Sequence, residues 1–488
     1  MALLVILQEL IPLQDPKDGW KANYGFWIRD AIMAFVVNLT NLGQAPFFIS
    51  DLPISKLQLV IVAACTSSAF TAIAIPVVAN FRFPVPFFVM TFAPLYYVLQ
   101  IIMFRIVMGG VIFRAMLAHR FQLERYMAFI TIQFTLVLVY PAYEALFHVA
   151  EGTPYQLPVI LVLPVIKVVA KNMVLRCTKH LEDMMPEAAI FTVDYFNAIY
   201  VATCMQSSSS TSAITAITLT DLSQALLMFY GLHRHTTNIL PRVGRIVNEI
   251  PKDERLLLSL GALSRESGSL GTNIRLRSCI PHRLSPADEE LLNTLDKTVH
   301  ASGPRIEASE GSLEIMHREK SSTLGKDSSR LTLGRNNVIY PLIRGSITPA
   351  EKKKVLREGL EVLFTTECLV VAVYLEAAVP ILYSGYMVAM VYFPSAQYHS
   401  EMAGITRVNV GSTVFPVFMF GLLQVVSFTL LAIVIKRNCG MRALWQLAFV
   451  LESQMSLVQG KLVVWIMITL CFRLSHFGVD FTFKSLTS

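Results

Sequence analysis

The feature that most constrains this chain is the recurrence of long apolar stretches with almost no charge. A helix needs about 20 apolar residues to cross the hydrocarbon core of a bilayer. A soluble protein has about 25% charged residues, whereas this chain of 488 residues has 15%. The sequence therefore predicts an all-α, polytopic membrane protein with about eight to ten transmembrane helices. Nine candidate spans are predicted at 58–78, 83–104, 126–147, 157–174, 189–206, 211–231, 362–392, 411–435 and 459–478.

Charged residues near the two ends of the chain favour positions at the membrane surface. The segment 20–50 places Arg29 and Asp30 beside an apolar run, which is typical of an amphipathic interfacial helix. Arg473 and His476 are close enough to the end of the last predicted span to reach the headgroups. The apolar start of the chain has no basic region before it, so we expect no cleaved signal peptide.

The basic residues indicate an orientation. The segment 232–357 carries 21 of the 41 Lys and Arg residues and 14 acidic residues, so the whole net charge of +7 lies there. The connectors 105–125, 175–188 and 436–442 are also basic, and alternation of nine spans places all of them on the same side. Because basic connectors stay in the cytosol, we expect the N-terminus and this loop there. Its Ser, Gly and Arg content predicts a largely disordered loop.

This pattern divides the chain into five segments. They are a cytosolic segment 1–57, a six-helix membrane region 58–231, the loop 232–357, a three-helix region 358–480 and a tail 481–488. Within the three-helix region, 441–457 is predicted to be an interfacial helix, with a short crossing as the alternative.

No motif indicates a cofactor, a metal site or an enzyme. The seven cysteines form no C-x-x-C pair, and no phosphate-binding loop or hydrolase motif is present. Paired intramembrane aspartates are used by proteases of the presenilin type. Here, however, Val193-Asp194 and Thr220-Asp221 depart from the Tyr-Asp and Gly-x-Gly-Asp of that family. An intramembrane enzyme is therefore the least favoured of the hypotheses.

Ionisable residues inside predicted spans are the best candidates for function, because each costs about 2.5–3.5 kcal/mol to insert. Asp194 and Asn197 are three residues apart and share one helix face. Asp221 lies with Thr218 on a polar stripe of the next span, and a short turn makes the two spans antiparallel. Both aspartates are then at similar depth, where Lys167 of the preceding span can reach either.

Two glutamates belong to the seventh predicted span. Glu367 and Glu376 are nine residues apart, which is about 900° of rotation, so they face opposite sides of a straight helix. A bend at Pro380 would change this. The candidate polar path comprises Lys167, Asp194, Asn197, Thr218, Asp221, Glu367 and Glu376. Transport of a solute or ion is the leading hypothesis, and helix packing by mutually neutralised residues is the alternative.

The end of the loop is predicted to contact lipid. The four basic residues Lys352, Lys353, Lys354 and Arg357 adjoin a span, and each basic residue near an anionic surface contributes about 1 kcal/mol. A plain cytosolic stop signal is the alternative. Nucleic acid is not expected, because no aromatic or Gly-rich RNA motif accompanies the cluster.

The loop also offers phosphorylation candidates. Ser321 follows Arg318 and Lys320, and Ser346 lies close to the basic cluster, where a phosphate would weaken lipid attraction. An ordinary linker is the alternative. The second functional hypothesis is accordingly a membrane sensor or scaffold whose loop binds protein partners or anionic lipid.

Several segments together resemble an uncharacterised family of multi-pass membrane proteins expanded in oomycetes. They are Leu157-Pro158 with Lys167 and Lys171-Asn172, His180-Leu181-Glu182-Asp183 with Pro186-Glu187, Asp194 to Ala198, Trp445 to Glu452 and His476 to Phe481. The resemblance covers the membrane regions and not the loop. It implies a shared fold, and it brings no activity and no site residues.

Overall fold

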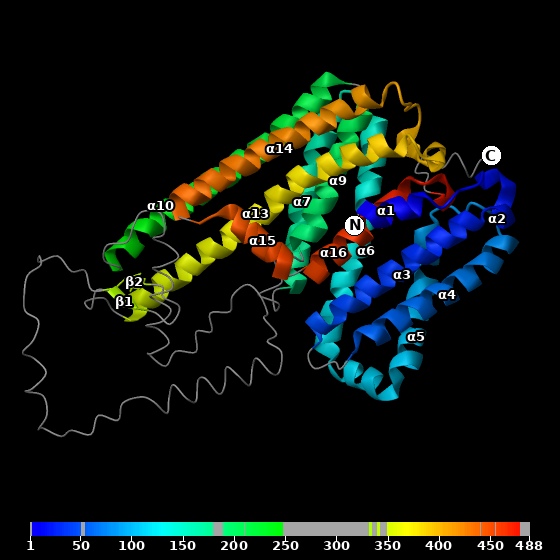
Figure 1. Ribbon diagram of the computed structural model, residues 1–488, viewed down its shortest axis with the longest axis horizontal. Coiled ribbons are helices and arrows are strands. Elements are labelled where there is room, and N and C mark those ends of the chain that lie inside the picture. Colours follow the sequence, from blue (N-terminus) through cyan, green and yellow to red (C-terminus); the bar gives the residue numbers. More distant parts are fainter. Residues whose placement is uncertain are drawn as a thin grey trace, which may run out of the picture. The chain divides into compact units, whose positions relative to one another are not determined.

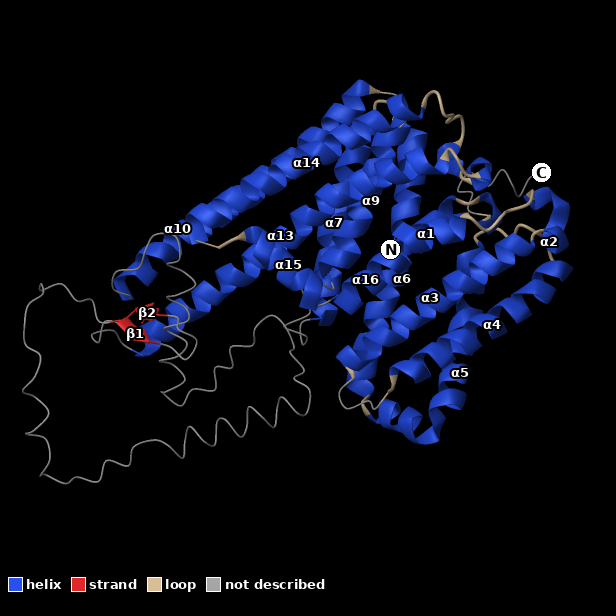
Figure 2. Cartoon of the chain, in the orientation of Figure 1, coloured by secondary structure: helices blue, strands red, loops and turns tan. Residues whose placement is uncertain are grey.

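The computed structural model describes residues 2–49, 54–178, 189–208, 210–246, 331–333, 339–341, 349–439, 441–453 and 455–478. Most of these residues are helical (Figure 2). The helices are α1 Ala2–Glu9, α2 Gly19–Ala22, α3 Tyr24–Phe48, α4 Lys56–Asn80, α5 Phe88–Ala118, α6 Arg120–Ala150, α7 Gln156–Thr178, α9 Tyr195–Ser207, α10 Thr211–Ile246, α13 Pro349–Met390, α14 Val410–Cys439, α15 Ala443–Ser453 and α16 Met455–Arg473. A π-helical turn, Ile190–Asp194, leads into α9.

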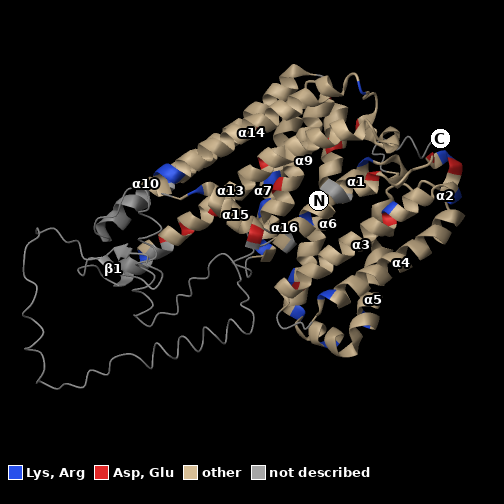
Figure 3. Ribbon diagram, in the orientation of Figure 1, with Lys and Arg blue, Asp and Glu red and all other residues tan. Residues whose placement is uncertain are grey.

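Within the described residues, eight helices are long and apolar enough to cross a membrane: α3, α4, α5, α6, α7, α10, α13 and α14. This confirms the predicted all-α, multi-pass membrane class. Charged residues are sparse along most of these helices (Figure 3). Seven of the eight candidate spans contain an internal proline, the exception being Thr211–Arg234 of α10. The prolines are Pro46, Pro76, Pro94, Pro141, Pro164, Pro380 and Pro416. Membrane helices tolerate proline because neighbouring groups satisfy the freed backbone atoms.

The sequence predicts an interfacial helix at 20–50, whereas the helix found there has the length and composition of a membrane span. Helix α3 has 25 residues and is among the eight candidate spans. The sequence argument placed it at the surface because of Arg29 and Asp30, yet both side chains are buried. A buried charge within a helix bundle does not mark the membrane surface. Since α3 is a candidate crossing that the orientation argument did not count, the cytosolic side of the N-terminus stays a prediction.

Two other predicted spans are helical in the described residues but are not among these eight. The segment 189–206 forms the π-helical turn and α9, which has only 13 residues. The segment 459–478 falls on α16, of 19 residues, and on a short 3₁₀ turn at Ser475–Phe477. Helix α9 is buried on nearly all sides, since every residue from Ala189 to Met205 is buried. Its apolar composition therefore reflects a place inside the bundle.

One compact unit comprises Met1–Thr237 and Glu361–Ser488. Helices α3, α4 and α5 pack in sequence order, α6 packs on α7, and α16 packs on α3 (Figure 1). Helix α9 contacts α6 and α14. The aromatic rings of Tyr140 on α6 stack on Phe196 and Tyr200 of α9, with ring centroids 5.4 and 5.3 Å apart. These contacts fix α9 at the centre of the elements that carry the candidate site.

The second unit is Asn238–Leu360. Its described parts include the strands β1 Leu331–Leu333 and β2 Ile339–Pro341, which pair antiparallel.

Candidate functional site

Lys167 of α7 holds the centre of an ionic cluster within the membrane helices. Its Nζ lies 2.5 Å from Glu376 Oε1 on α13 and 3.3 Å from Asp194 Oδ1 at the end of the π-helical turn. A second amine, Lys171 Nζ, lies 2.9 Å from the same Asp194 oxygen. One lysine therefore links three separate elements. The contact between Lys167 and Asp194 agrees with the depth argument from the sequence.

Asp221 of α10 belongs to the same cluster. It accepts a hydrogen bond from Gln424 Nε2 of α14 and interacts electrostatically with Lys167 and Glu376. We call Lys167, Lys171, Asp194, Asp221, Glu376 and Gln424 the Lys167 cluster. It contains three carboxylates and two amines, so it carries one excess negative charge when all five are ionised. One bound proton or one monovalent cation would neutralise it.

Exposure within the Lys167 cluster rises from the centre outward. The side chain of Asp194 is fully buried at 0%, Lys167 and Glu376 are exposed at 12% and 16%, and Lys171 at 32%. Lys171 also lies about two turns before the end of α7. The cluster therefore leads from a fully buried carboxylate to a side chain at the surface of the bundle.

Each charged residue at the centre adjoins an irregular point of its helix. Lys167 follows Pro164 by three residues, and Glu376 precedes Pro380 by four, so its carbonyl is the one that the proline leaves without its helical partner. Asp194 ends the π-helical turn. Kinks occur at prolines and π-turns, and π-turns are frequent at functional sites. The helices are thus able to bend where their charges meet.

A cavity lies beside the elements that carry the Lys167 cluster. It has a volume of about 490 Å³ and is lined by parts of α1, α9, α13 and α16. Tyr195 and Leu375 line it, and each is the chain neighbour of a cluster carboxylate, Asp194 or Glu376. The volume is in the range typical of small-molecule sites, about 300–1,000 Å³. Its walls are mostly aliphatic and tyrosine side chains.

Arg473 forms a second ionic centre at the end of this cavity. Its guanidinium contacts Glu401 and lies 3.8 Å from Glu144 Oε1, and its Nη1 donates to the hydroxyl oxygen of Tyr383 at 3.3 Å. Tyr383 also donates to Glu401 at 3.0 Å. The expectation that Arg473 extends to the headgroups is wrong, because its side chain is 5% exposed. His476 is likewise buried, with Nε2 donating to Gln14 O at 2.8 Å.

A third ionic group ties the first helix to the bundle. Glu9 Oε2 lies 2.9 Å from Arg29 Nη1, and Ser395 Oγ donates to the same oxygen at 2.9 Å. The remaining nitrogens of Arg29 donate to backbone carbonyls of Glu9 and Ile11. Burial by itself would raise the pKa of Glu9, but His399 and Arg29 outweigh it and lower the pKa to about 2. Glu9 thus stays ionised in a closed set of partners.

The other predicted path residues lie around the Lys167 cluster in different ways. Asn197 is buried and lines a small cavity of about 20 Å³ together with Asp221. Thr218 donates to Ile214 O of its own helix at 2.9 Å. Glu367 is half-buried on α13, which is helical through Glu376, so the two glutamates stay on opposite sides of that helix.

Sequence reasoning missed Lys171, Gln424 and Lys461. Lys461 of α16 is buried, donates to Thr192 Oγ1 of the π-helical turn at 3.3 Å, and lies 4.9 Å from the ring of Phe129. A systematic search for Lys residues within apolar stretches would have found both lysines. An amide such as Gln424 gives no comparable signal.

The predicted loop features fall largely outside the described residues. Ser321 and Ser346 lie outside them, as do most of 232–357 and the tail 481–488. Lys352, Lys353, Lys354 and Arg357 lie on α13, where the Lys354 side chain is exposed. Lipid binding, partner binding by the loop and phosphorylation stay predictions. Among the described residues, no group of His, Cys, Asp and Glu has a metal-binding arrangement.

No protein-family model, no curated protein and no solved structure matches the chain. The resemblance to an oomycete family therefore stays a prediction, and the site is interpreted from its own residues.

Proposed function

We propose that this multi-pass membrane protein transports a small solute or ion, and that the Lys167 cluster exchanges a proton or a monovalent cation during transport. The observation that carries the proposal is the sharing of one lysine between Asp194 and Glu376, 3.3 and 2.5 Å from its Nζ. A purely structural pair needs one partner of each charge. A lysine between two carboxylates has two alternative partners.

The charge balance of the cluster supports an exchangeable ion. Uncompensated charge at membrane depth costs about 2.5–3.5 kcal/mol or more, and the Lys167 cluster has one carboxylate in excess. Asp221 is the carboxylate without a lysine within ion-pair distance among the described residues, since its hydrogen bond comes from Gln424. A proton or cation arriving at Asp221 or Glu376 would remove the excess and free Lys167 to pair with Asp194 alone.

The neighbouring cavity supports a solute that moves with this ion. Tyr195 and Leu375 line the cavity of about 490 Å³, and the adjacent residues Asp194 and Glu376 hold Lys167. A solute that presses on these walls would move the two carboxylates relative to each other. The helices can bend at the π-helical turn and at Pro380. The apolar, tyrosine-rich walls favour a solute with a large apolar part.

Uptake into proteoliposomes tests the proposal. The full chain is reconstituted and screened by solid-supported-membrane electrometry with organic acids, amino acids, sugars, Na⁺, K⁺ and a pH step. We expect a saturable signal for the wild type and a loss of about tenfold or more in Asp221→Asn. Asp18→Asn, an exposed position on the 3₁₀ turn Pro16–Asp18, is the matched control and should leave the signal unchanged. Equal signals in the wild type and Asp221→Asn, or no signal with any solute, would contradict transport through this cluster.

A further inference from the structure

A buried carboxylate outside the Lys167 cluster has no hydrogen-bond or ion-pair partner among the described residues. Asp30 of α3 is 0% exposed, and neither of its oxygens accepts a hydrogen bond from the described part of the chain. The adjacent Arg29 is fully used by Glu9 and the Ile11 carbonyl. A buried ionised group without a partner is costly, so it must take up a proton or a cation.

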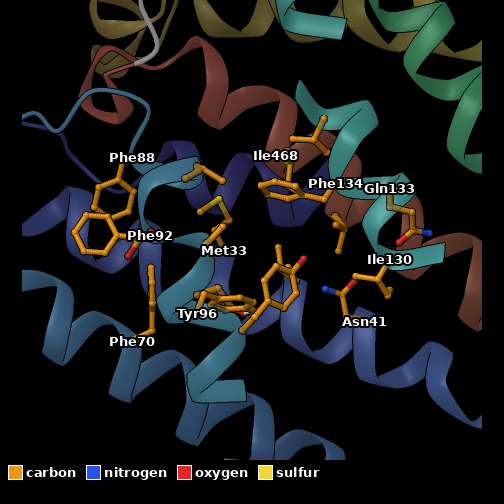
Figure 4. Close-up of a pocket in the computed structure, with 18 of the residues that line it drawn as sticks. Met33, Asn41, Phe70, Phe88, Phe92, Tyr96, Ile130, Gln133, Phe134 and Ile468 are labelled. Carbon is orange, nitrogen blue, oxygen red and sulfur yellow. Dashed lines mark hydrogen bonds between the residues drawn. The ribbon is translucent and has the colours of Figure 1, made fainter. Parts of the chain in front are cut away.

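Asp30 lines a cavity of about 90 Å³ between α3, α4, α5, α6 and α16. The walls are rich in aromatic rings, chiefly Phe70, Phe88, Phe92, Tyr96, Phe134 and Trp465. In Figure 4, Phe70, Phe88 and Phe92 lie toward one end of this cavity and Phe134, Ile130 and Gln133 toward the other. Edge-to-face packing fixes the rings, with Phe70 and Tyr96 centroids 5.5 Å apart and nearly perpendicular.

Three physical properties limit what this cavity binds. The face of an aromatic ring is negative and attracts a cation within about 6 Å of its centre. Bare metal ions are disfavoured, because they require several oxygen ligands, usually with more than one carboxylate. The lining offers one carboxylate, Asp30, besides the amides of Asn41 and Gln133 and the hydroxyls of Tyr96 and Tyr97. The cavity volume of about 90 Å³ is several times the roughly 10–15 Å³ that one water requires, so it admits a ligand of a few heavy atoms.

We propose that this cavity binds a small organic ammonium ion, with Asp30 as its counter-charge and the aromatic rings around its alkyl groups. Combined carboxylate and cation–π recognition is the chemistry that suits methylated amines. Tyr97 and Phe134, whose ring centroids are 6.4 Å apart and edge-to-face, are half-buried members of the lining, so a ligand could enter past them. The site is separate from the Lys167 cluster and does not depend on the proposed transport.

Equilibrium dialysis tests the proposal with the full chain in dodecyl maltoside and radiolabelled trimethylammonium as the probe. The maltoside carries no ammonium headgroup that would compete. We expect saturable binding of one ion per chain, and competition by methylammonium but not by uncharged tert-butanol. Asp30→Asn should weaken binding by roughly 30-fold or more, and Trp465→Leu by roughly 2- to 30-fold, the range of one cation–π contact.

The controls separate loss of the site from loss of the fold. Asp30→Asn keeps the side-chain shape and removes a costly buried charge, so it should elute as the wild type and melt at an equal or higher temperature. Asp18→Asn, which is exposed, should bind like the wild type. Absent binding in the wild type, or equal binding in Asp30→Asn, would overturn the proposal and leave Asp30 as a protonated structural residue.

Discussion

The Lys167 cluster and the Glu9–Arg29 group are both buried and ionic, yet they differ in how completely their members are satisfied. Every guanidinium nitrogen of Arg29 has an acceptor, and Glu9 Oε2 receives partners from α3 and from the loop after α13. Lys167 has two competing carboxylates, and a third lies nearby. The Glu9–Arg29 group therefore has one stable set of ion pairs, whereas Lys167 can pair with either of two carboxylates.

The backbone around the two sites differs in the same sense. The Lys167 cluster is built where π-helical and proline-containing helices meet, at Asp194, Pro164 and Pro380. The Glu9–Arg29 group joins the end of the short helix α1 to one regular turn of α3. The comparison teaches that burial of charge does not identify function by itself. A surplus of partners at deformable helix positions does so better.

The largest expected change in stability comes from removing the Arg29 charge from the Glu9–Arg29 group. Arg29→Gln should lower the free energy of unfolding by about 3–5 kcal/mol, because it removes the guanidinium that pairs with the buried Glu9 charge. Denaturant titration of the purified chain in detergent measures this. Arg120→Gln, at an exposed arginine, should change it by less than about 0.5 kcal/mol. A small loss of unfolding free energy in Arg29→Gln would mean that the Glu9–Arg29 group does not stabilise the fold.

Acid should lower the free energy of unfolding through His476. Burial lowers the pKa of His476 from 6.5 to about 4, so the unfolded chain binds this proton more readily than the folded chain. Its contribution is fully present above pH 6.5 and is lost as the pH falls toward 4. Between pH 7 and pH 5 the loss should be about 2 kcal/mol. Melting curves of the wild type and His476→Gln measure it, and an equal slope in both would exclude His476 as the cause.

Neutralising one carboxylate of the Lys167 cluster should cost much less. In Glu376→Gln, Lys167 keeps Asp194 and the excess negative charge disappears, so we expect a loss of about 1 kcal/mol or less in unfolding free energy. The same denaturant titration provides the value beside that of Arg29→Gln. A loss as large as that of Arg29→Gln would erase the distinction between the two sites.

The smallest effect is expected at the outer edge of the cluster. Lys171 is the most exposed member at 32%, and pairs near the surface contribute about 0.2–1 kcal/mol. Lys171→Gln should therefore lower the unfolding free energy by less than about 1 kcal/mol, and high salt should reduce the difference. A salt-independent loss of several kcal/mol would show that Lys171 is part of a buried pair.

Much of the fold follows from hydropathy alone. Seven of the nine predicted spans coincide with helices long enough to cross a membrane. Hydropathy misreads the surroundings of Arg29 and of the segment around α9, because it measures composition only. Arg29 looked like a surface charge, but Glu9, twenty residues earlier in the chain, neutralises it within the bundle. The segment around α9 is as apolar as a span because protein surrounds it.

The candidate site was only partly predictable. Depth in the membrane brought Lys167 to Asp194, since both lie at similar depth on successive predicted spans. The pairing of Lys167 with Glu376 joins residues 209 positions apart, and no local pattern encodes such a contact. The separation of Glu367 from Glu376 did follow, because it depends only on helix geometry.

The most direct test of the account is ion exchange at the Lys167 cluster. Proteoliposomes that contain a pH-sensitive dye, the wild-type chain or Glu376→Gln are given a solute that the electrometric screen has identified. We expect solute entry to move protons, or to require Na⁺ or K⁺, in the wild type, and this coupling to be lost in Glu376→Gln while the protein stays folded. Solute entry with the same ion dependence in both proteins would contradict the central claim that the shared lysine marks an exchanging site.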